Sequence, residues 1–199
     1  FANMIKVLEV IRQGEIGGGE SHVIDLVLHF DFNTVKPIVL AMSDGPMIQR
    51  LTAAGIECIV IPSSKAFDFM VMSQIRRIVR EKKIDVIHAH GSRAASNMIF
   101  VAKLCHTPII YTVHGWSFHD GQNTMIYKLR AWSEKLICWL AQKVICVSAS
   151  NAETGRATFG LSQPCIIENG VDIERFSPSV THADIRKEFG ISKQAIVVA

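Results

Sequence analysis

The 199-residue sequence has few of the features that mark membrane-spanning, nucleic-acid-binding or disulfide-rich proteins. No apolar run approaches the roughly 18 residues of a membrane-spanning helix. The net charge is only +3 and no segment interleaves basic with aromatic residues, which argues against a nucleic-acid partner. The five cysteines are odd in number, widely spaced and without a C-x-x-C pair. We therefore expect most of them to be small buried hydrophobes in a reducing cytoplasm.

Two nucleotide-binding fingerprints are also absent. No G-x-x-x-x-G-K-[ST] segment occurs, which excludes a P-loop nucleotide hydrolase. A G-x-G-x-x-G match that begins at Gly17 fails at its last position, where His22 stands. No acidic residue ends the second apolar run to hold a ribose. Both departures argue against a nicotinamide-dependent oxidoreductase.

Short apolar runs alternate with longer segments of helical periodicity along most of the sequence. The runs are rich in Val and Ile and show no inside–outside alternation, which is typical of strands covered on both faces. The pattern predicts an α/β fold with a doubly wound, mostly parallel sheet and helices on both faces. The predicted strands are residues 5–11, 37–42, 57–61, 85–89, 108–113, 143–147 and 165–168.

The last residues suggest that the sequence contains two domains. A short helix is predicted near residues 184–189, and residues 194–199 form an apolar run typical of a strand. A buried strand needs further elements to cover it, and the sequence ends there. We therefore expect residues 1–177 to form an N-terminal Rossmann-like domain, and residues 178–199 to be a linker and the first strand of a truncated second domain.

The longest predicted helix covers residues 125–139. Its apolar residues recur at the spacing of a buried stripe, so we expect the stripe to face the core. The alternative is contact with an anionic membrane surface, because Trp and Lys side chains suit that interface. The apolar stripe consists of Met125, Leu129, Trp132, Leu136 and Trp139.

The most informative segment is a run of three glycines between the first strand and the first helix. Gly17, Gly18 and Gly19 place free backbone N–H groups and the positive end of a helix dipole at one point. Such a turn holds an anion, most often a phosphate. The alternative is a tight strand–helix turn without a ligand. Glu20 suits the helix dipole but would repel a phosphate unless its side chain points aside.

Histidines stand where strands should end at the ligand-binding edge of the sheet. His88 and His90 share one strand face because they are two residues apart, and His114 ends the next strand. His114 is the strongest candidate, since Gly115 lets a ligand approach and imidazole both donates and accepts hydrogen bonds. The alternatives are polar lining of a crevice and a zinc site that includes His119. No known ligand spacing supports zinc, so we expect no metal.

Five motifs are spread along nearly the whole sequence. They are the strand–GGGE–helix segment at residues 17–20, and residues 85–90, 108–115, 144–148 and 166–176, the last with the sequence N-G-V-D. Each is weak alone, but together and in this order they resemble the N-terminal, acceptor-side half of a family 4 (group 1) retaining glycosyltransferase of the GT-B fold.

The resemblance implies two Rossmann-like domains that face a cleft, with residues 1–177 on the acceptor side and residues 178–199 leading into a donor-binding domain. It implies transfer of a sugar from a nucleotide-diphosphate sugar to an acceptor, with retention, and with neither a bound cofactor nor a required metal. The three glycines would meet the donor phosphates, and His114 would be the catalytic residue beside the sugar. The family's paired glutamates and its phosphate-clamping Arg and Lys belong to the second domain, so we expect the sequence alone to be inactive.

The family also suggests where the acceptor binds. The candidates are His22, His90, Arg93 and Trp116, with Phe118 as a second ring on which a sugar could stack. Assembly of cell-surface polysaccharide or glycolipid is the family's commonest role, so we expect a cytoplasmic protein with peripheral contact to the inner face of the membrane. The alternatives are a nucleotide-sugar epimerase or another GT-B relative, and a non-catalytic module that binds a nucleotide or sugar.

Overall fold

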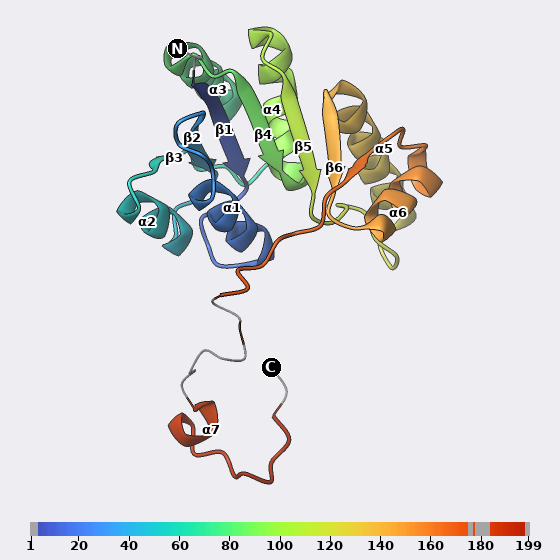
Figure 1. Cartoon of the computed structure of the whole chain (residues 1–199). Coiled ribbons are helices and arrows are strands. Elements are labelled where there is room, and N and C mark those ends of the chain that lie inside the picture. The colour runs from blue at the N-terminus through green and yellow to red at the C-terminus, as the bar shows by residue number, and fades with distance from the viewer. Residues whose placement is uncertain (1–3, 175–176, 178–183, 198–199) are drawn as a thin grey trace. The chain divides into compact units, whose positions relative to one another are not determined.

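A seven-stranded parallel sheet forms the centre of the computed structural model, which describes residues 4–174, 177 and 184–197 (Figure 1). The strand order is β3-β2-β1-β4-β5-β6-β7, so the chain starts near the middle of the sheet and winds toward both edges. This confirms the predicted doubly wound α/β fold, and all seven predicted strands form. Their bounds are β1 Ile5–Ile11, β2 Val35–Ala41, β3 Glu57–Val60, β4 Val86–His90, β5 Ile109–Val113, β6 Lys143–Cys146 and β7 Cys165–Ile166.

Helices follow the strands, and side chains at their N-termini fix where several of them begin. The Asp68 carboxylate accepts hydrogen bonds from the first N–H groups of α3, and the Ser148 hydroxyl accepts one from the N–H of Asn151 in α6. The helices connecting the strands are α1 Gly18–Leu28, α2 Pro46–Ala53, α3 Phe69–Lys82, α4 Gly91–Cys105, α5 Thr124–Leu140 and α6 Ala149–Phe159.

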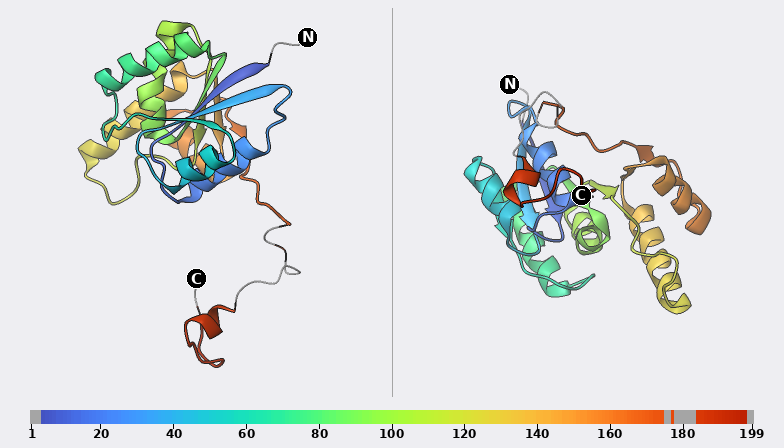
Figure 2. Two further views of the ribbon diagram at one scale, coloured as in Figure 1. Left: turned by 90° about the vertical axis from the view of Figure 1, so that its left-hand side faces the viewer. Right: turned by 90° about the horizontal axis from the view of Figure 1, so that it is seen from below.

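Two apolar cores lie on the two faces of the sheet. Helices pack over both of these faces (Figure 2). Helices α1 and α2 cover one face, where Val23 and Leu51 belong to the same core as Val39. Helices α3 and α4 cover the other face, where Ile75 and Met98 belong to the larger core. Successive strand residues point to opposite faces and therefore enter different cores. Burial on both faces explains why the strand sequences lack inside–outside alternation.

The orientation of α5 differs from the expectation. Its buried residues are Ala131, Glu134 and Ile137, so the predicted apolar stripe does not face the core. Trp132 is 63% exposed and Trp139 is 77% exposed. The physical reason is that the Glu134 carboxylate collects hydrogen bonds from the sheet side of the helix. That polar anchor turns the apolar stripe outward.

The chain divides into two compact units, Phe1–Asn169 and Gly170–Ala199. The expected division into domains at residue 177 stays a prediction. Within the second unit, α7 (Ile185–Glu188) follows Asp184, whose carboxylate accepts hydrogen bonds from the first N–H groups of the helix. Residues 194–197 do not form the predicted strand. A strand needs a neighbour to satisfy its backbone N–H and C=O groups, and the described part of this unit contains no other strand. Residues 198–199 lie outside the described residues.

The cysteines are free thiols, but most are not fully buried. Only Cys146 is buried; Cys58, Cys105 and Cys138 are half-buried, and Cys165 is exposed. The expectation of buried cysteines is wrong for Cys165 because it lies on the edge strand β7. Within the described ranges, no helix has both the length and the apolar character needed to cross a membrane.

Candidate functional site

The chain segments that follow β1, β4 and β5 surround a cavity of about 780 Å³. Parallel strands end at one edge of their sheet, and that edge is where doubly wound proteins place a ligand. The cavity brings together the predicted residues Gly17, Gly18, Gly19, His90, Arg93, His114 and Trp116. His22 reaches the same group from α1, since its ring centroid lies 5.1 Å from that of His114.

The glycine loop forms the N-terminus of α1. Gly17 is the N-cap with extended backbone, and no side chain caps the helix. The first N–H groups of a helix have no partner within it, so at this turn they are free to donate to an anion. Glu20 is buried, and its carboxylate lies so close to Gly17 that a side chain at that position would collide with it. An anion at the loop would therefore also approach a negative charge.

Three arginines line the same cavity and bring positive charge to it. They are Arg12, Arg93 and Arg130. Arg130 is oriented by a hydrogen bond of 2.8 Å from Nη1 to the carbonyl oxygen of Ser117. Arg12 and Arg130 were not among the site residues predicted from the sequence. Arg12 directly follows the first strand and was a detectable signal, whereas Arg130 reaches the cavity only because α5 folds back beside the β5 end.

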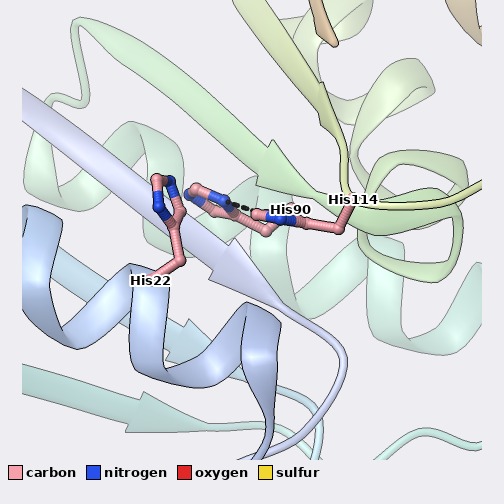
Figure 3. Close-up of side chains that lie close together, drawn as sticks. All are labelled: His22, His90 and His114. Atoms are coloured by element: carbon pink, nitrogen blue, oxygen red, sulfur yellow. Dashed lines mark hydrogen bonds between the residues drawn. The ribbon is translucent and has the colours of Figure 1, made fainter. Parts of the chain in front are cut away.

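A buried carboxylate, Glu9, anchors a chain of hydrogen bonds that ends at His114. Oε2 of Glu9 lies 2.7 Å from Nε2 of His90 and 2.9 Å from Nδ1 of His88. Nδ1 of His90 lies 3.2 Å from Nε2 of His114, the contact drawn dashed in Figure 3. Nε2 of His88 lies 2.8 Å from the hydroxyl oxygen of Thr112. The network joins β1, β4 and β5.

Strand register explains why these side chains meet. Glu9 is paired with His88 in the β1–β4 ladder, and His90 is paired with Thr112 in the β4–β5 ladder. Residues two apart point to the same face, so His114 continues the row. Glu9 was not among the site residues predicted from the sequence. The signal was a single carboxylate inside a buried apolar strand, in a chain whose H-x-H motif ends another strand.

Burial and mutual contact shift the protonation of this row. Burial by itself would raise the pKa of Glu9, but His88 and the hydrogen bonds from His88 and His90 lower it to about 2. Burial, reinforced by neighbouring histidines, lowers the pKa of His90 to about 4 and that of His114 to about 3. Burial also lowers the pKa of His22. At neutral pH, Glu9 is ionised while His90 and His114 are uncharged.

A second buried carboxylate, Glu134 of α5, shapes the wall of the cavity. It accepts hydrogen bonds from the Tyr111 hydroxyl at 2.9 Å and from both the backbone N–H and the hydroxyl of Ser117, at 3.2 and 2.6 Å. The Ser92 hydroxyl at the start of α4 is a further donor. Burial is the main cause that raises the pKa of Tyr111, and the nearby negative charge of Glu134 raises it further. The carboxylate fixes the segments after β4 and β5 relative to α5.

Trp116 lines the cavity but is held by protein contacts. Its Nε1 donates to the carbonyl oxygen of Asn151 at 2.9 Å, and its ring stacks on Phe118 with centroids 5.6 Å apart. Phe118 is only 4% exposed, so the expectation that it stacks on a sugar is wrong. Its position in the aromatic cluster around Phe159 explains the burial.

Among the residues that the structure describes, two groups of side chains have three potential metal-binding atoms within 4.8 Å of one another. The groups are His22–His90–His114 and Glu9–His88–His90. His90 belongs to both, and its Nε2 is already hydrogen-bonded to Glu9. His119, which the zinc alternative included, is exposed and contacts the Asp120 carbonyl oxygen instead. Hydrogen bonds join Glu9, His88, His90 and His114. His22 contacts the group through its ring.

A parallel sheet in this order, with a helix N-terminus and histidines around one cavity at its carboxyl edge, defines the Rossmann-like half of a GT-B protein. The family model described as Glycosyltransferase Family 4 matches residues 16–175. The chain therefore belongs to this family.

Several relatives of this chain are named as glycosyltransferases. The UDP-Gal:alpha-D-GlcNAc-diphosphoundecaprenol alpha-1,3-galactosyltransferase of Escherichia coli is 22% identical over 177 residues, which cover 84% of this chain and 44% of the relative. The O-antigen biosynthesis glycosyltransferase WbnH of Escherichia coli is 27% identical over 165 residues, covering 79% of this chain and 46% of the relative. The chain thus spans about half the length of the curated relatives it matches.

Solved structures share the fold. Anabaena Alr3699/HepE in complex with UDP and glucose has a TM-score of 0.75 at 20% identity, over 94% of this chain and 50% of that chain. A putative UDP-N-acetylglucosamine 2-epimerase from Listeria monocytogenes has a TM-score of 0.66 at 16% identity, over 94% of this chain and 52% of that chain. Likeness at such identities shows the GT-B fold and does not separate transferase from epimerase.

Proposed function

We propose that this chain is the acceptor-side half of a glycosyltransferase that moves a sugar, with retention, from a nucleotide-diphosphate sugar to a carbohydrate or lipid-linked acceptor. The observation that carries the proposal is the shared cavity, because the N-terminus of α1 and the His114 imidazole both line it. An anion at the glycine loop and a sugar attached to that anion would therefore lie beside His114.

The cavity suits the charges of this reaction. The bond between the anomeric carbon and the diphosphate oxygen breaks, the nucleoside diphosphate keeps the electron pair, and the acceptor oxygen bonds to that carbon and releases its proton. Negative charge thus grows on the leaving phosphate. The N–H groups of Gly17, Gly18 and Gly19, with Arg12 and Arg130 nearby, are oriented before the reaction and stabilise that charge. In this proposal the protein groups replace a metal ion.

Of the other predicted residues, His22, Arg93 and Trp116 would contact the acceptor. His22 and Arg93 lie around the same space as His114, and the half-buried Trp116 lines it. The predicted contact through His90 is wrong, because its side chain is 0% exposed and both ring nitrogens are hydrogen-bonded to Glu9 and His114. The Escherichia coli galactosyltransferase is named for a diphosphoundecaprenol-linked sugar acceptor. An acceptor of that chemical class, a sugar on a lipid diphosphate, is our proposal for this chain.

The exposed stripe of α5 supports peripheral membrane contact. Trp132, Trp139 and Leu129 are exposed on one side of the helix, and Lys128 and Lys135 flank them. Tryptophan and lysine together suit the boundary between headgroups and acyl chains of an anionic membrane. Such contact would bring the cavity close to a lipid-linked acceptor at the inner face of the membrane.

The direct test joins this chain to a second GT-B half and assays sugar transfer. UDP- and GDP-sugars are offered with a diphosphoprenol-linked sugar, and the anomeric configuration of the product is determined by NMR. We expect an α-linked product from an α-linked donor, and none from this chain alone. Conversion of UDP-N-acetylglucosamine to its 2-epimer without acceptor would identify an epimerase instead. Nucleotide binding without any turnover would identify a non-catalytic module.

A further inference from the structure

We infer that Glu9 and His90 are positioning residues that fix the tautomer of His114, with its hydrogen on Nε2 and its lone pair on Nδ1, so that His114 accepts a hydrogen bond from a carbohydrate hydroxyl. The inference rests on the proposed function and deepens it, because it states which chemical group of the ligand faces His114. That group is a hydroxyl and not a phosphate oxygen.

The direction of the hydrogen bonds is set at Glu9. An ionised carboxylate only accepts, so both rings that contact Oε2 must donate to it. These donors are Nε2 of His90 at 2.7 Å and Nδ1 of His88 at 2.9 Å. The Glu9 side chain is 1% exposed, and its other oxygen, Oε1, has no hydrogen-bond partner within the described part of the chain. The two imidazoles therefore provide the hydrogen bonds that hold this buried charge.

The hydrogen bond between His90 and His114 has a direction that follows from the one between His90 and Glu9. A neutral imidazole carries one hydrogen, so His90 with its hydrogen on Nε2 has a lone pair on Nδ1. That Nδ1 lies 3.2 Å from Nε2 of His114, which must then be the donor. Burial holds the pKa of His90 at about 4 and that of His114 at about 3, which keeps both rings neutral at pH 7.

The result is an acceptor atom at the cavity. His114 has used its one hydrogen, and its Nδ1 has no hydrogen bond to any residue the structure describes, while the ring lines the cavity. A lone pair attracts an O–H group and repels a phosphate oxygen. The helix N-terminus at Gly18 and Gly19 has the opposite preference, because N–H groups attract phosphate oxygens. The two sides of the cavity thus orient a sugar phosphate, with a hydroxyl toward His114 and the phosphate toward the loop.

Tautomers of histidine rings are measured directly by two-bond ¹H–¹⁵N correlation NMR on protein labelled with ¹⁵N at histidine. At pH 7 we expect His90 and His114 of the unsubstituted protein each to show the Nε2–H tautomer. An Nδ1–H tautomer at His114 would overturn the inference, and this result needs no variant to fold.

Substitution of Glu9 tests whether the carboxylate sets the direction. Glu9→Leu removes the acceptor, so His114 should change to a mixture of both tautomers. Glu9→Gln keeps one oxygen acceptor and should restore mostly the Nε2–H form. The matched control is Glu153→Gln, an exposed carboxylate of α6 that should leave the ring signals unchanged. A folded Glu9→Leu protein with an unaltered His114 spectrum would contradict the role of Glu9.

These measurements use no sugar donor and are separate from the transfer assay. A wrong tautomer would leave the proposed transferase activity standing. Absence of transfer with the expected tautomers would overturn the proposed function and keep the hydrogen-bond assignment.

Discussion

A side-chain carbon placed on Gly19 would lie 3.9 Å from Cδ2 of His114. Gly19 lies at the start of α1 and His114 follows β5. The two residues are so close that a methyl group on Gly19 would contact the His114 ring. The glycine loop and the imidazole therefore belong to one ligand surface. Substitutions on either side should affect binding of the same ligand.

Gly19→Ala tests the phosphate side of this surface. Its Cβ would make only ordinary contacts, at 3.9 Å from His114 and from Ile11, so the fold should be retained. The methyl group would still occupy the space where a diphosphate approaches the backbone. We expect the affinity for UDP, measured by calorimetry on the protein joined to its second half, to fall about tenfold, or about 1.4 kcal/mol. Thermal unfolding of the variant gives the control, and unchanged affinity would place the phosphates elsewhere.

His114→Ala tests the sugar side. A residue that touches the reacting sugar typically contributes about 10²-fold or more to the rate, so most of the transfer activity should disappear. The measurement is kcat with the donor in excess. The control is His29→Ala, an exposed histidine at the end of α1 whose Nδ1 lies 2.7 Å from the carbonyl oxygen of Asp25. Nearly full activity of the His114 variant would show that this residue is misassigned.

Glu134→Ala should strongly destabilise the fold. The substitution leaves the Tyr111 hydroxyl and the Ser117 donors without their buried acceptor, which costs about 3 kcal/mol. Urea unfolding measures the loss. Glu153→Ala, an exposed carboxylate on the neighbouring helix, should change stability little. Equal midpoints for the two variants would mean that the Glu134 network does not hold the cavity wall together.

Stability should fall as the pH drops below about 6.5. Folding lowers the pKa of His90 from 6.5 to about 4 and that of His114 from 6.5 to about 3. Between these values and pH 6.5, the unfolded chain therefore binds more protons than the folded chain. The stability that these two histidines contribute is present in full above pH 6.5, and it is lost as the pH falls toward their pKa values in the folded state. We expect a loss of about 2 kcal/mol between pH 7 and pH 5.5. Glu9, with its pKa lowered from 4.5 to about 2, adds a further loss below pH 4.5.

Denaturant unfolding at a series of pH values measures this dependence. The variant His114→Gln has no group to titrate at this position and should show a shallower slope between pH 7 and pH 5.5. A slope identical to that of the unsubstituted protein would contradict the lowered pKa of His114.

Replacing Trp132 and Trp139 together by Ser should weaken binding to vesicles that contain anionic lipid. These rings are 63% and 77% exposed and carry much of the apolar area of the α5 stripe. Vesicle sedimentation with and without salt measures the partition, and salt should weaken it because Lys128 and Lys135 contribute. The matched control is Phe69→Ser, an exposed ring at the start of α3 that is 77% exposed. Similar losses in both variants would argue against docking through α5.

The fold was predictable because its signals are local. Seven apolar runs and the periodic segments between them define a parallel sheet with covered faces, and three consecutive glycines mark a helix start able to hold an anion. The position of α5 was not predictable in this way. Its apolar stripe has helical spacing, but a single carboxylate, Glu134, accepts four hydrogen bonds from β5, from the segment after β5 and from α4. These bonds decide which side of the helix is buried. Hydrogen bonds between distant segments leave no periodic trace in a sequence.

The sequence by itself determined that the fold is a doubly wound parallel sheet, that three glycines precede the first helix, and that histidines stand at the ends of β4 and β5. Only the tertiary structure decided which of these side chains touch. Glu9 and His90 are 81 residues apart and meet because parallel pairing places β1 beside β4 in one register. Arg130 reaches the same cavity because α5 packs beside the end of β5. Strand character depends on neighbouring residues, whereas register between distant strands is fixed by the packing of the whole sheet.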